Sequence, residues 1–255
     1  MPIEIDQFMC RSDNFGVLMR DSRTGETALI DAPEEKPILA AIERTGWTPT
    51  VILTTHHHPD HVEANLALKE RFGLKIIGPK SEAANIPGID ETVEEGSVLK
   101  FGGQDVLVYH TPGHTLGHVS FHLPEAKLLF AADTLFALGC GRLLEGTPAQ
   151  MWASLKRLSA LPADTTVYCG HEYTQSNARF ALSVDPGNEK LKDRAAEIDA
   201  LRAEGKPTLP TTIGRELETN PFLRPHDPAI RRLLGMEGAS DEAVFAEIRK
   251  RKDNF

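Results

Sequence analysis

Seven consecutive residues carry four imidazoles and one carboxylate: Thr55-His56-His57-His58-Pro59-Asp60-His61. They directly follow the apolar run Val51-Ile52-Leu53-Thr54, which predicts a strand buried on both faces. No packing requirement calls for so many ligand-type side chains in one turn. We therefore interpret the stretch as the first half of a two-metal site, so the rest of the chain must supply the other half and the substrate contacts.

The spacing within this stretch suggests how its ligands divide. Residues two apart in an extended segment point the same way, so His56 and His58 can hold one ion. Pro59 then turns the chain, which lets Asp60 and His61 face a second ion. His57 is expected to point elsewhere and to be structural. A lone histidine is more often an ordinary surface or core residue than a ligand, but that interpretation weakens for H-x-H-x-D-H at a strand end.

The remaining ligands must come from further along the chain. A catalytic zinc-type site needs three or four protein ligands and an open position for water, so one cluster cannot complete two sites. Three candidates follow apolar strands: His114 in P-G-H-T, Asp133 in A-D-T and His171 in G-H-E. Each of them alone would favour an ordinary role, but their shared position at strand ends favours a site.

Strand and helix signals divide the chain into two regions. Up to about residue 171 strands dominate, with a hairpin over 17–31, further strands at 74–78, 104–110, 119–123, 127–131 and 165–169, and helical stretches at 34–44, 62–69 and 148–161. After Tyr173 strand signals vanish, and helical patterns cover 174–184, 189–204, 228–234 and 241–251. We predict a catalytic domain over residues 1–172 and a helical substrate-binding domain over residues 173–255.

Composition narrows the class of protein. A 255-residue chain with 40% hydrophobic and 25% charged residues is typical of soluble globular proteins. The acidic stretch 1–6 lacks the features of a secretory signal, and no apolar run is long enough to span a bilayer. Three scattered cysteines favour a reducing compartment, and a net charge of −9 disfavours nucleic-acid binding. We therefore expect a cytoplasmic protein that binds neither nucleic acid nor membrane.

The complete motif set resembles the metallo-β-lactamase superfamily over about residues 10–172. The resemblance implies an α/β fold, the αβ/βα sandwich of that superfamily, here followed by an all-helical C-terminal domain. The ligands that it implies are His56, His58 and His114 for the first metal, Asp60, His61 and His171 for the second, and Asp133 together with a hydroxide as bridges. Five imidazoles and two carboxylates suit two divalent ions, with zinc as the leading expectation and iron or manganese as alternatives.

The implied chemistry is hydrolysis by metal-activated water. Metal binding lowers the pKa of bound water to roughly 7, and the metals polarise the carbonyl under attack. Asp60 is expected to orient the nucleophile with its non-bridging oxygen. Asp60 and Asp133 are therefore the candidate catalytic residues.

Five further motifs are spread along the chain: G-C-G-R at 139–142, E-G-T at 145–147, C-G-H-E-Y-T at 169–174, N-P-F-L-R at 220–224 and R-K-R-K-D-N-F at 249–255. Together they resemble glyoxalase II, the hydroxyacylglutathione hydrolases, over essentially the whole chain. The resemblance implies a thioesterase that cleaves S-D-lactoylglutathione to D-lactate and glutathione, the second step of methylglyoxal detoxification. The expected partner is therefore a small glutathione thioester, and we expect the protein to be a monomer.

Glutathione carries two carboxylates, so an acidic protein must place cations to bind it. Arg249 and Lys252 lie three apart on a predicted helix and share a face, and the family pattern R-x-x-K-D-x-F puts them on the glycine-end carboxylate. Arg142 and Tyr173 are the other contacts that the resemblance implies. An ordinary alternative is that the basic run stabilises a helix C-terminus. Leu144 stands where eukaryotic members often have tyrosine, which is expected to weaken affinity without changing the reaction.

Leaving-group chemistry favours a thioester, because a thiolate with a pKa of about 8.5 needs little protonation, whereas an amide nitrogen needs a proton donor. The rivals are another superfamily hydrolase, either a lactonase or a β-lactamase, an iron-dependent glutathione persulfide dioxygenase, and a metal-binding protein with a relict site. The dioxygenase needs only one metal, so the complete second ligand set argues against it. The filled ligand positions argue against a relict site.

Overall fold

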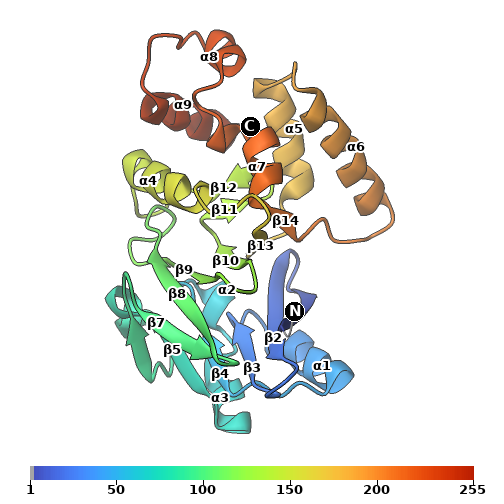
Figure 1. The fold of residues 1–255 in the computed structure, drawn as a ribbon, viewed down its shortest axis with the longest axis vertical. Coiled ribbons are helices and arrows are strands. Elements are labelled where there is room, and N and C mark those ends of the chain that lie inside the picture. The colour runs from blue at the N-terminus through green and yellow to red at the C-terminus, as the bar shows by residue number, and fades with distance from the viewer. Residues whose placement is uncertain (1–2) are drawn as a thin grey trace. The chain divides into compact units, whose positions relative to one another are not determined.

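The computed structural model describes residues 3–255, so Met1 and Pro2 of the acidic amino-terminal stretch lie outside the described residues. The chain forms two compact units (Figure 1). The first contains Met1–His110 with Gly117–Phe130, and the second contains Thr111–Leu116 with Ala131–Phe255. These units interleave along the chain, so the boundary at residue 172 remains a prediction.

The first unit is built on a six-stranded mixed sheet. Its order is β1 (Ile3–Cys10), β2 (Asn14–Asp21), β3 (Thr27–Ile30), β4 (Val51–Leu53), β5 (Lys75–Pro79) and β6 (Glu91–Val93). The first three strands are antiparallel and the rest are added in parallel. The predicted hairpin is confirmed, with Met19 opposite Ala28. Ile52 and Leu53 of β4 are buried, as predicted for a strand inside a sheet.

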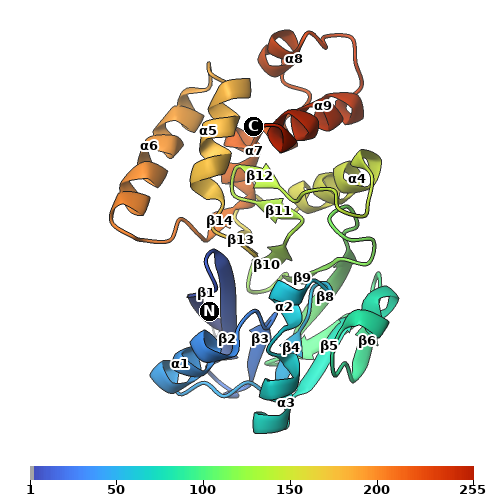
Figure 2. The ribbon, with the colours of Figure 1, turned by 180° about the vertical axis from the view of Figure 1, so that it is seen from behind.

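Helices α1 (Glu35–Thr45) and α3 (Asn65–Phe72) pack against this sheet (Figure 2). One core cluster joins their apolar side chains to alternate strand residues, and it includes Ile38, Ile42, Leu68, Leu18, Leu29, Ile52 and Ile76. The single helix predicted over 62–69 is wrong in detail. A one-turn helix α2 (Pro59–Val62) precedes α3, and a 3₁₀ helix η1 (Lys80–Asn85) follows β5. Pro59 accounts for the separate start, because proline favours a first helical position.

Four antiparallel strands follow in the chain, and the last of them runs from the first unit into the second. They are β7 (Val98–Phe101), β8 (Gln104–His110), β9 (Val119–Leu123) and β10 (Leu128–Ala132). Val106, Val108 and Phe121 are fully buried on them, which reflects the alternation expected of strands with one face on a core. The predicted strands at 104–110, 119–123 and 127–131 are therefore confirmed, whereas β6 and β7 were not predicted.

The second unit is mainly helical. Its helices are α4 (Pro148–Ser159), α5 (Thr174–Val184), α6 (Glu189–Ala203), α7 (Ile213–Thr219), η2 (Pro221–Leu223), α8 (Pro228–Leu234) and α9 (Asp241–Asp253). Helices α5 and α6 lie side by side (Figures 1 and 2). Thr147 begins α4 with a capping box, which satisfies amide groups that a helix start leaves without intrahelical partners. No helix in the described part of the chain has the length and apolar character to cross a bilayer.

Two short strand pairs also belong to this unit. Strand β13 (Thr166–Cys169) pairs with β14 (Thr211–Thr212) in the second six-stranded sheet, whose order is β14-β13-β10-β9-β8-β7. Strand β11 (Leu135–Phe136) pairs with β12 (Gly139–Cys140) in a separate two-stranded sheet. Strand β14 corrects the expectation that strands end before Tyr173. Two residues are too few to produce an alternating pattern, so the sequence could not indicate this strand.

Candidate active site

Strand β4 delivers the histidine cluster at its C-terminal end, as the sequence predicted. The ring centroids of His56 and His58 are 4.8 Å apart, and those of His56 and His61 are 4.1 Å apart. Oδ2 of Asp60 lies 3.9 Å from Nε2 of His61. The first unit therefore brings its four predicted ligands together.

Asp31 supports this cluster from the end of the neighbouring parallel strand β3. Its Oδ1 accepts a hydrogen bond from the Thr55 amide at 2.7 Å, and its Oδ2 accepts one from Thr55 Oγ1 at 2.8 Å. Oδ2 also lies 2.8 Å from Nδ1 of His61, and Thr55 Oγ1 lies 3.0 Å from Nδ1 of His56. A histidine held through Nδ1 ligates a metal through Nε2, so both rings have the orientation that a metal requires.

The sequence prediction missed Asp31. The signal that could have found it is its position after the apolar strand Thr27–Ile30, the same criterion that identified the later ligands.

Two further polar residues, Asn14 and Glu82, contact the cluster. Asn14 Nδ2 donates to the main-chain oxygen and to Oδ2 of Asp60, both at 3.1 Å. Glu82 Oε2 accepts from the amide of His57 at 2.7 Å and lies 2.8 Å from Nδ1 of that ring. This contact agrees with a structural role for His57. Glu82 lies 25 residues further along the chain, and no local pattern in the sequence indicates its contact.

In the second unit, Asp133 joins the other two predicted ligands. Its Oδ2 lies 3.4 Å from Nε2 of His114 and 3.2 Å from Nε2 of His171. Nδ1 of His114 is 2.9 Å from the main-chain oxygen of Arg142, so this ring also presents Nε2. All three ligand side chains are buried. Two imidazole nitrogens beside one carboxylate oxygen form a donor set that suits a divalent metal ion.

Tyr173 lies directly beside His171, one of the predicted ligands. Its ring stacks on His171 at a centroid distance of 4.7 Å and an interplanar angle of 5°. Phe136 of β11 meets the same imidazole edge-on at 6.0 Å. Tyr173 remains 39% exposed, so the predicted substrate residue is accessible while it packs against His171, a predicted metal ligand.

Arg249 is buried, although it was predicted as part of a basic helix face. Its Nη1 donates to the main-chain oxygen of Cys140 at 2.8 Å, and its Nη2 donates to Oδ1 of Asp253 at 2.8 Å. The guanidinium carbon lies 5.1 Å from the ring centroid of Phe222. Arg142 has an exposed side chain whose Nε is 4.0 Å from the same carboxylate oxygen of Asp253. The structure therefore brings both predicted arginines to Asp253, a residue that the sequence prediction did not single out.

Lys252 lies one turn of α9 away from Arg249. Its Nζ is 3.2 Å from both the main-chain oxygen and Oγ of Ser176, and it lies 5.4 Å and 5.5 Å from the rings of Phe180 and Phe255. Burial among these groups, together with the nearby cations Arg249 and Arg179, lowers the pKa of Lys252 to about 8.

The remaining residues of the prediction have ordinary surroundings. Leu144 is 59% exposed. Cys10, Cys140 and Cys169 are buried and form no disulfide. Burial raises the pKa of the Cys140 thiol to about 11 and also raises the pKa of Cys169, so both remain protonated at neutral pH. Protonated thiols agree with the absence of a thiolate role in the predicted chemistry.

The ligand types and their contacts fit a divalent metal. All seven predicted ligands are among the histidine and aspartate residues that could hold an ion. The contacts at Nδ1 of His56, His61 and His114 orient the opposite ring nitrogen as a ligand. Mixed imidazole and carboxylate donors suit zinc, iron and manganese.

Two family models together match residues 17–255. The model of the metallo-beta-lactamase superfamily matches residues 17–171, and the model of the hydroxyacylglutathione hydrolase C-terminus matches residues 172–255. The chain is 72% identical over 255 residues to a hydroxyacylglutathione hydrolase from Mesorhizobium japonicum, with 100% of each chain covered.

Solved structures agree with this assignment of the fold. ETHE1 from Myxococcus xanthus matches with a TM-score of 0.68 at 26% identity, over 97% of this chain and 90% of that one. The di-iron-bound form of TTHA1623 matches with a TM-score of 0.62 at 28% identity, over 86% of this chain and 100% of that one.

The predicted fold class is confirmed: the chain has the metallo-β-lactamase fold, with two mixed sheets and a C-terminal helical region. Its histidine and aspartate clusters are consistent with a binuclear metal site and with metal-dependent hydrolysis. The predicted family is confirmed as well, because full-length identity and both family models agree. The chain belongs to the hydroxyacylglutathione hydrolases, the glyoxalase II family of metal-dependent hydrolases within the metallo-β-lactamase superfamily.

Proposed function

We propose that this protein hydrolyses S-D-lactoylglutathione to D-lactate and glutathione, the second step of methylglyoxal detoxification. The observation that carries this proposal is the 72% identity, over the whole chain, to a relative named hydroxyacylglutathione hydrolase. The two ligand sets supply the means of hydrolysis. A thiolate with a pKa of about 8.5 leaves readily, so the reaction needs no dedicated proton donor.

Our proposal for the metal centre assigns every predicted ligand. His56, His58 and His114 would hold one ion, Asp60, His61 and His171 would hold the second, and Asp133 would contribute its carboxylate to both. When bound, such ions supply Lewis acidity and lower the pKa of a coordinated water to about 7. We propose zinc, with iron and manganese as alternatives, and the di-iron-bound form of TTHA1623 is the reason to test iron.

The two aspartates are the proposed catalytic residues. Asn14 donates to Oδ2 of Asp60 at 3.1 Å, which restrains that carboxylate. A restrained carboxylate can orient the attacking water and accept its proton, because it already has the required direction. Asp133 contributes by placing its Oδ2 beside Nε2 of both His114 and His171, so that the three donor atoms lie close together.

Arg142, Tyr173, Arg249 and Lys252 are the proposed glutathione contacts. Arg142 and Tyr173 are accessible, and Lys252 offers an ammonium group. Arg249 already donates to Asp253, four residues along the same helix, which is also what simple stabilisation of a helix end would produce. A binding measurement therefore has to distinguish the two roles.

Steady-state turnover of three substrate types tests the activity. The protein is expected to hydrolyse S-D-lactoylglutathione with a much higher kcat/KM than a lactone or a β-lactam. Preferential turnover of either of the other two substrates would refute the assignment. Oxygen consumption with glutathione persulfide would instead identify a dioxygenase.

We further propose that the protein works as a monomer in the cytoplasm. The support is that its three cysteines are buried and form no disulfide, as is typical of a reducing compartment. Light scattering of the purified protein at several concentrations would test the oligomeric state.

A further inference from the structure

A short hairpin in the second unit supports several of the proposed site residues. We call residues 134–142, which contain β11 and β12, the ligand hairpin. The main-chain oxygen of Cys140 accepts from Arg249, and that of Arg142 lies 2.9 Å from Nδ1 of His114. Gly141 packs so closely on Asp133 that a Cβ there would collide with the Asp133 carbonyl oxygen. A shift of this hairpin would therefore move a metal ligand and a substrate contact together.

The turn of the ligand hairpin adopts a backbone conformation that needs support. Leu138 has a φ of 57°, a value that residues with a side chain rarely adopt. Its side chain is fully buried in a cluster with Ala178, Ala181 and Leu191. The turn therefore packs against helices α5 and α6, and its polar main-chain groups need partners inside the protein.

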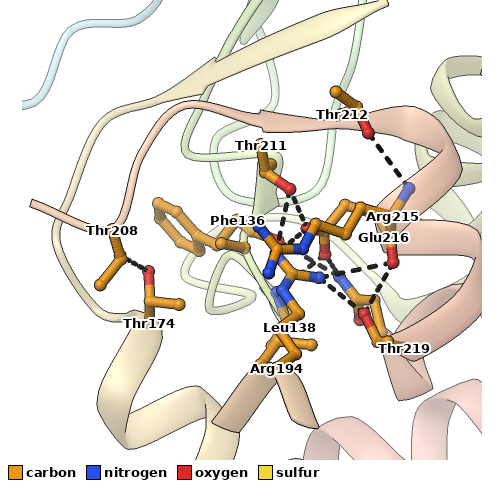
Figure 3. Close-up of polar contacts among 12 residues, drawn as sticks. Phe136, Leu138, Thr174, Arg194, Thr208, Thr211, Thr212, Arg215, Glu216 and Thr219 are labelled. Atoms are coloured by element: carbon orange, nitrogen blue, oxygen red, sulfur yellow. Dashed lines mark hydrogen bonds and ion pairs between the residues drawn. The ribbon is translucent and has the colours of Figure 1, made fainter. Parts of the chain in front are cut away.

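Those partners are side chains of the surrounding helices. Glu216 Oε2 accepts from the amide of Leu138 at 2.8 Å (Figure 3). Asn220 Nδ2 donates to the main-chain oxygens of Phe136 at 3.2 Å and Gly139 at 3.0 Å, and to Glu216 Oε2 at 3.0 Å. Both side chains are fully buried, so water does not compete for these contacts.

A third buried side chain holds the same turn. Asn177 Nδ2 donates to the main-chain oxygen of Ala137 at 3.1 Å. All four residues of the turn, 136–139, thus have a main-chain group bound by a buried side chain.

Glu216 links this turn to a buried ion pair. Its Oε1 accepts from Thr211 Oγ1 at 2.7 Å and from Arg194 Nη2 (Figure 3). Arg194 also donates to Thr219 Oγ1 at 2.6 Å. One carboxylate oxygen therefore faces the ion pair, while the other faces the ligand hairpin.

We propose that Glu216 is a positioning residue: through the amide of Leu138 and through Asn220 it holds the ligand hairpin, and thereby fixes the imidazole of His114 and the guanidinium of Arg249. The inference rests on the proposed function, which makes His114 a metal ligand and Arg249 a substrate contact. The competing explanation is that Glu216 only neutralises Arg194 inside the core.

A pair of double variants separates these explanations. Arg194→Met/Glu216→Gln removes the ion pair but keeps an oxygen that accepts from Leu138. Arg194→Met/Glu216→Met removes the ion pair and that acceptor, with a side chain of similar length. The two proteins thus differ mainly at the contact with the ligand hairpin.

Each variant is purified as the full chain with its metals, and the rate of metal release to a chelator and the KM for S-D-lactoylglutathione are measured. The methionine variant should release metal about tenfold faster than the wild type, and its KM should be about tenfold higher. A factor of about ten is the low end of what the loss of a residue supporting a metal ligand costs. The glutamine variant should stay within about twofold of the wild type in both quantities. Equal behaviour of the two variants would overturn the proposal.

Asp185→Asn is the matched control. Asp185 is a buried carboxylate of the same unit that pairs with Arg224 and Asn188 and makes no hydrogen bond to the ligand hairpin. The Asp185→Asn variant should have a lower melting temperature than the wild type but an unchanged rate of metal release. Faster metal release in this control would assign the effect to general loss of stability and would also overturn the proposal.

Two measurements keep the inference testable in every case. If the methionine variant does not fold, Asn220→Ala replaces it, because this substitution directly removes the contacts with Phe136 and Gly139. Unchanged metal release in Asn220→Ala would again contradict the proposal.

In the full-length protein, ¹⁵N NMR of His114 reports whether Nδ1 carries the proton that bonds to the main-chain oxygen of Arg142. This measurement does not depend on whether the protein hydrolyses a thioester. A loss of that signature in the methionine variant supports the positioning role even if S-D-lactoylglutathione is not the substrate, and its retention contradicts that role.

Discussion

The two units hold their shares of the proposed ligands in different ways. In the first unit the ligands lie within residues 56–61, and side chains support them: Asp31 holds the imidazole of His61, and Asn14 holds Asp60. In the second unit the ligands come from three separate segments. There a main-chain oxygen holds His114, within a hairpin that buried side chains keep in place.

This difference determines which single substitutions can disturb the proposed ligands of each unit. A supporting side chain can be removed by one substitution, so the first ligand set should be sensitive at Asp31. A supporting main-chain oxygen cannot be removed in this way. Sensitivity in the second set therefore moves to residues that contact no ligand, such as Glu216 and Asn220.

The largest expected effect comes from the residue that joins the ligands of the second unit. Asp133→Ala removes the carboxylate that lies beside both His114 and His171. We expect metal and activity to be lost together, with kcat/KM lowered by more than about 100-fold, the upper range for residues that only support a ligand. Metal analysis and turnover on the same purified sample check this. A variant that retains its metals would show that these three residues do not act as one ligand set.

Arg249 tests whether the ligand hairpin also serves substrate binding. A charge-assisted contact contributes about 1.5–3 kcal/mol, so Arg249→Ala should raise KM about 10- to 150-fold and lower kcat much less. Arg251→Ala is the control, because Arg251 is exposed on the same helix and pairs only with Glu247 among the contacts described. An unchanged KM in Arg249→Ala would refute its role as a substrate contact.

Asp31 tests side-chain support in the first unit. Asp31→Asn replaces the carboxylate beside Nδ1 of His61 and should weaken metal affinity about 10- to 100-fold. Asp21→Asn is the matched control, since Asp21 is an equally buried carboxylate of this unit that binds Arg23 and Thr24 instead. Titration with a competing chelator measures the affinities. Equal metal affinities in Asp31→Asn and Asp21→Asn would contradict the claim that side chains support the ligands of the first unit.

The smallest effect concerns pH and Lys252. Burial, with Arg249 and Arg179 nearby, lowers the pKa of this side chain to about 8, so it is an ammonium ion below that pH and a neutral amine above it. Because only the ammonium form attracts a substrate carboxylate, kcat/KM should fall about tenfold as pH rises through about 8. Lys252→Arg keeps its charge and should lack this fall. If the wild type and Lys252→Arg show the same pH profile, the titrating group belongs to the substrate and not to Lys252.

The sequence indicated which candidate ligands of the first unit lie close together, because these residues are neighbours in the chain. Spacing alone suggested how His56, His58, Asp60 and His61 divide, and the structure brings them together. The later candidates, His114, Asp133 and His171, were identified by their positions after apolar strands, and the superfamily resemblance then assigned each of them to a metal. Asp31 was missed although it satisfies the same criterion, because one carboxylate after a strand carries no motif.

Tertiary contacts account for what the sequence could not indicate. The polar network around Glu216 joins helices α6 and α7 to a turn about eighty residues earlier, with 78 positions separating Leu138 from Glu216. No local periodicity encodes such a contact. Arg249 shows the same limit, because a basic run at a helix end suggests an exposed side chain, whereas its contacts with Cys140 and Phe222 bury it.

The central claim is that both ligand sets act together in one two-metal thioesterase. Its most direct test is the metal content per chain, measured on the same sample as the hydrolysis of S-D-lactoylglutathione. We predict two ions per chain, with activity that disappears on metal removal and returns on reconstitution. Full activity with one ion or none would contradict the account.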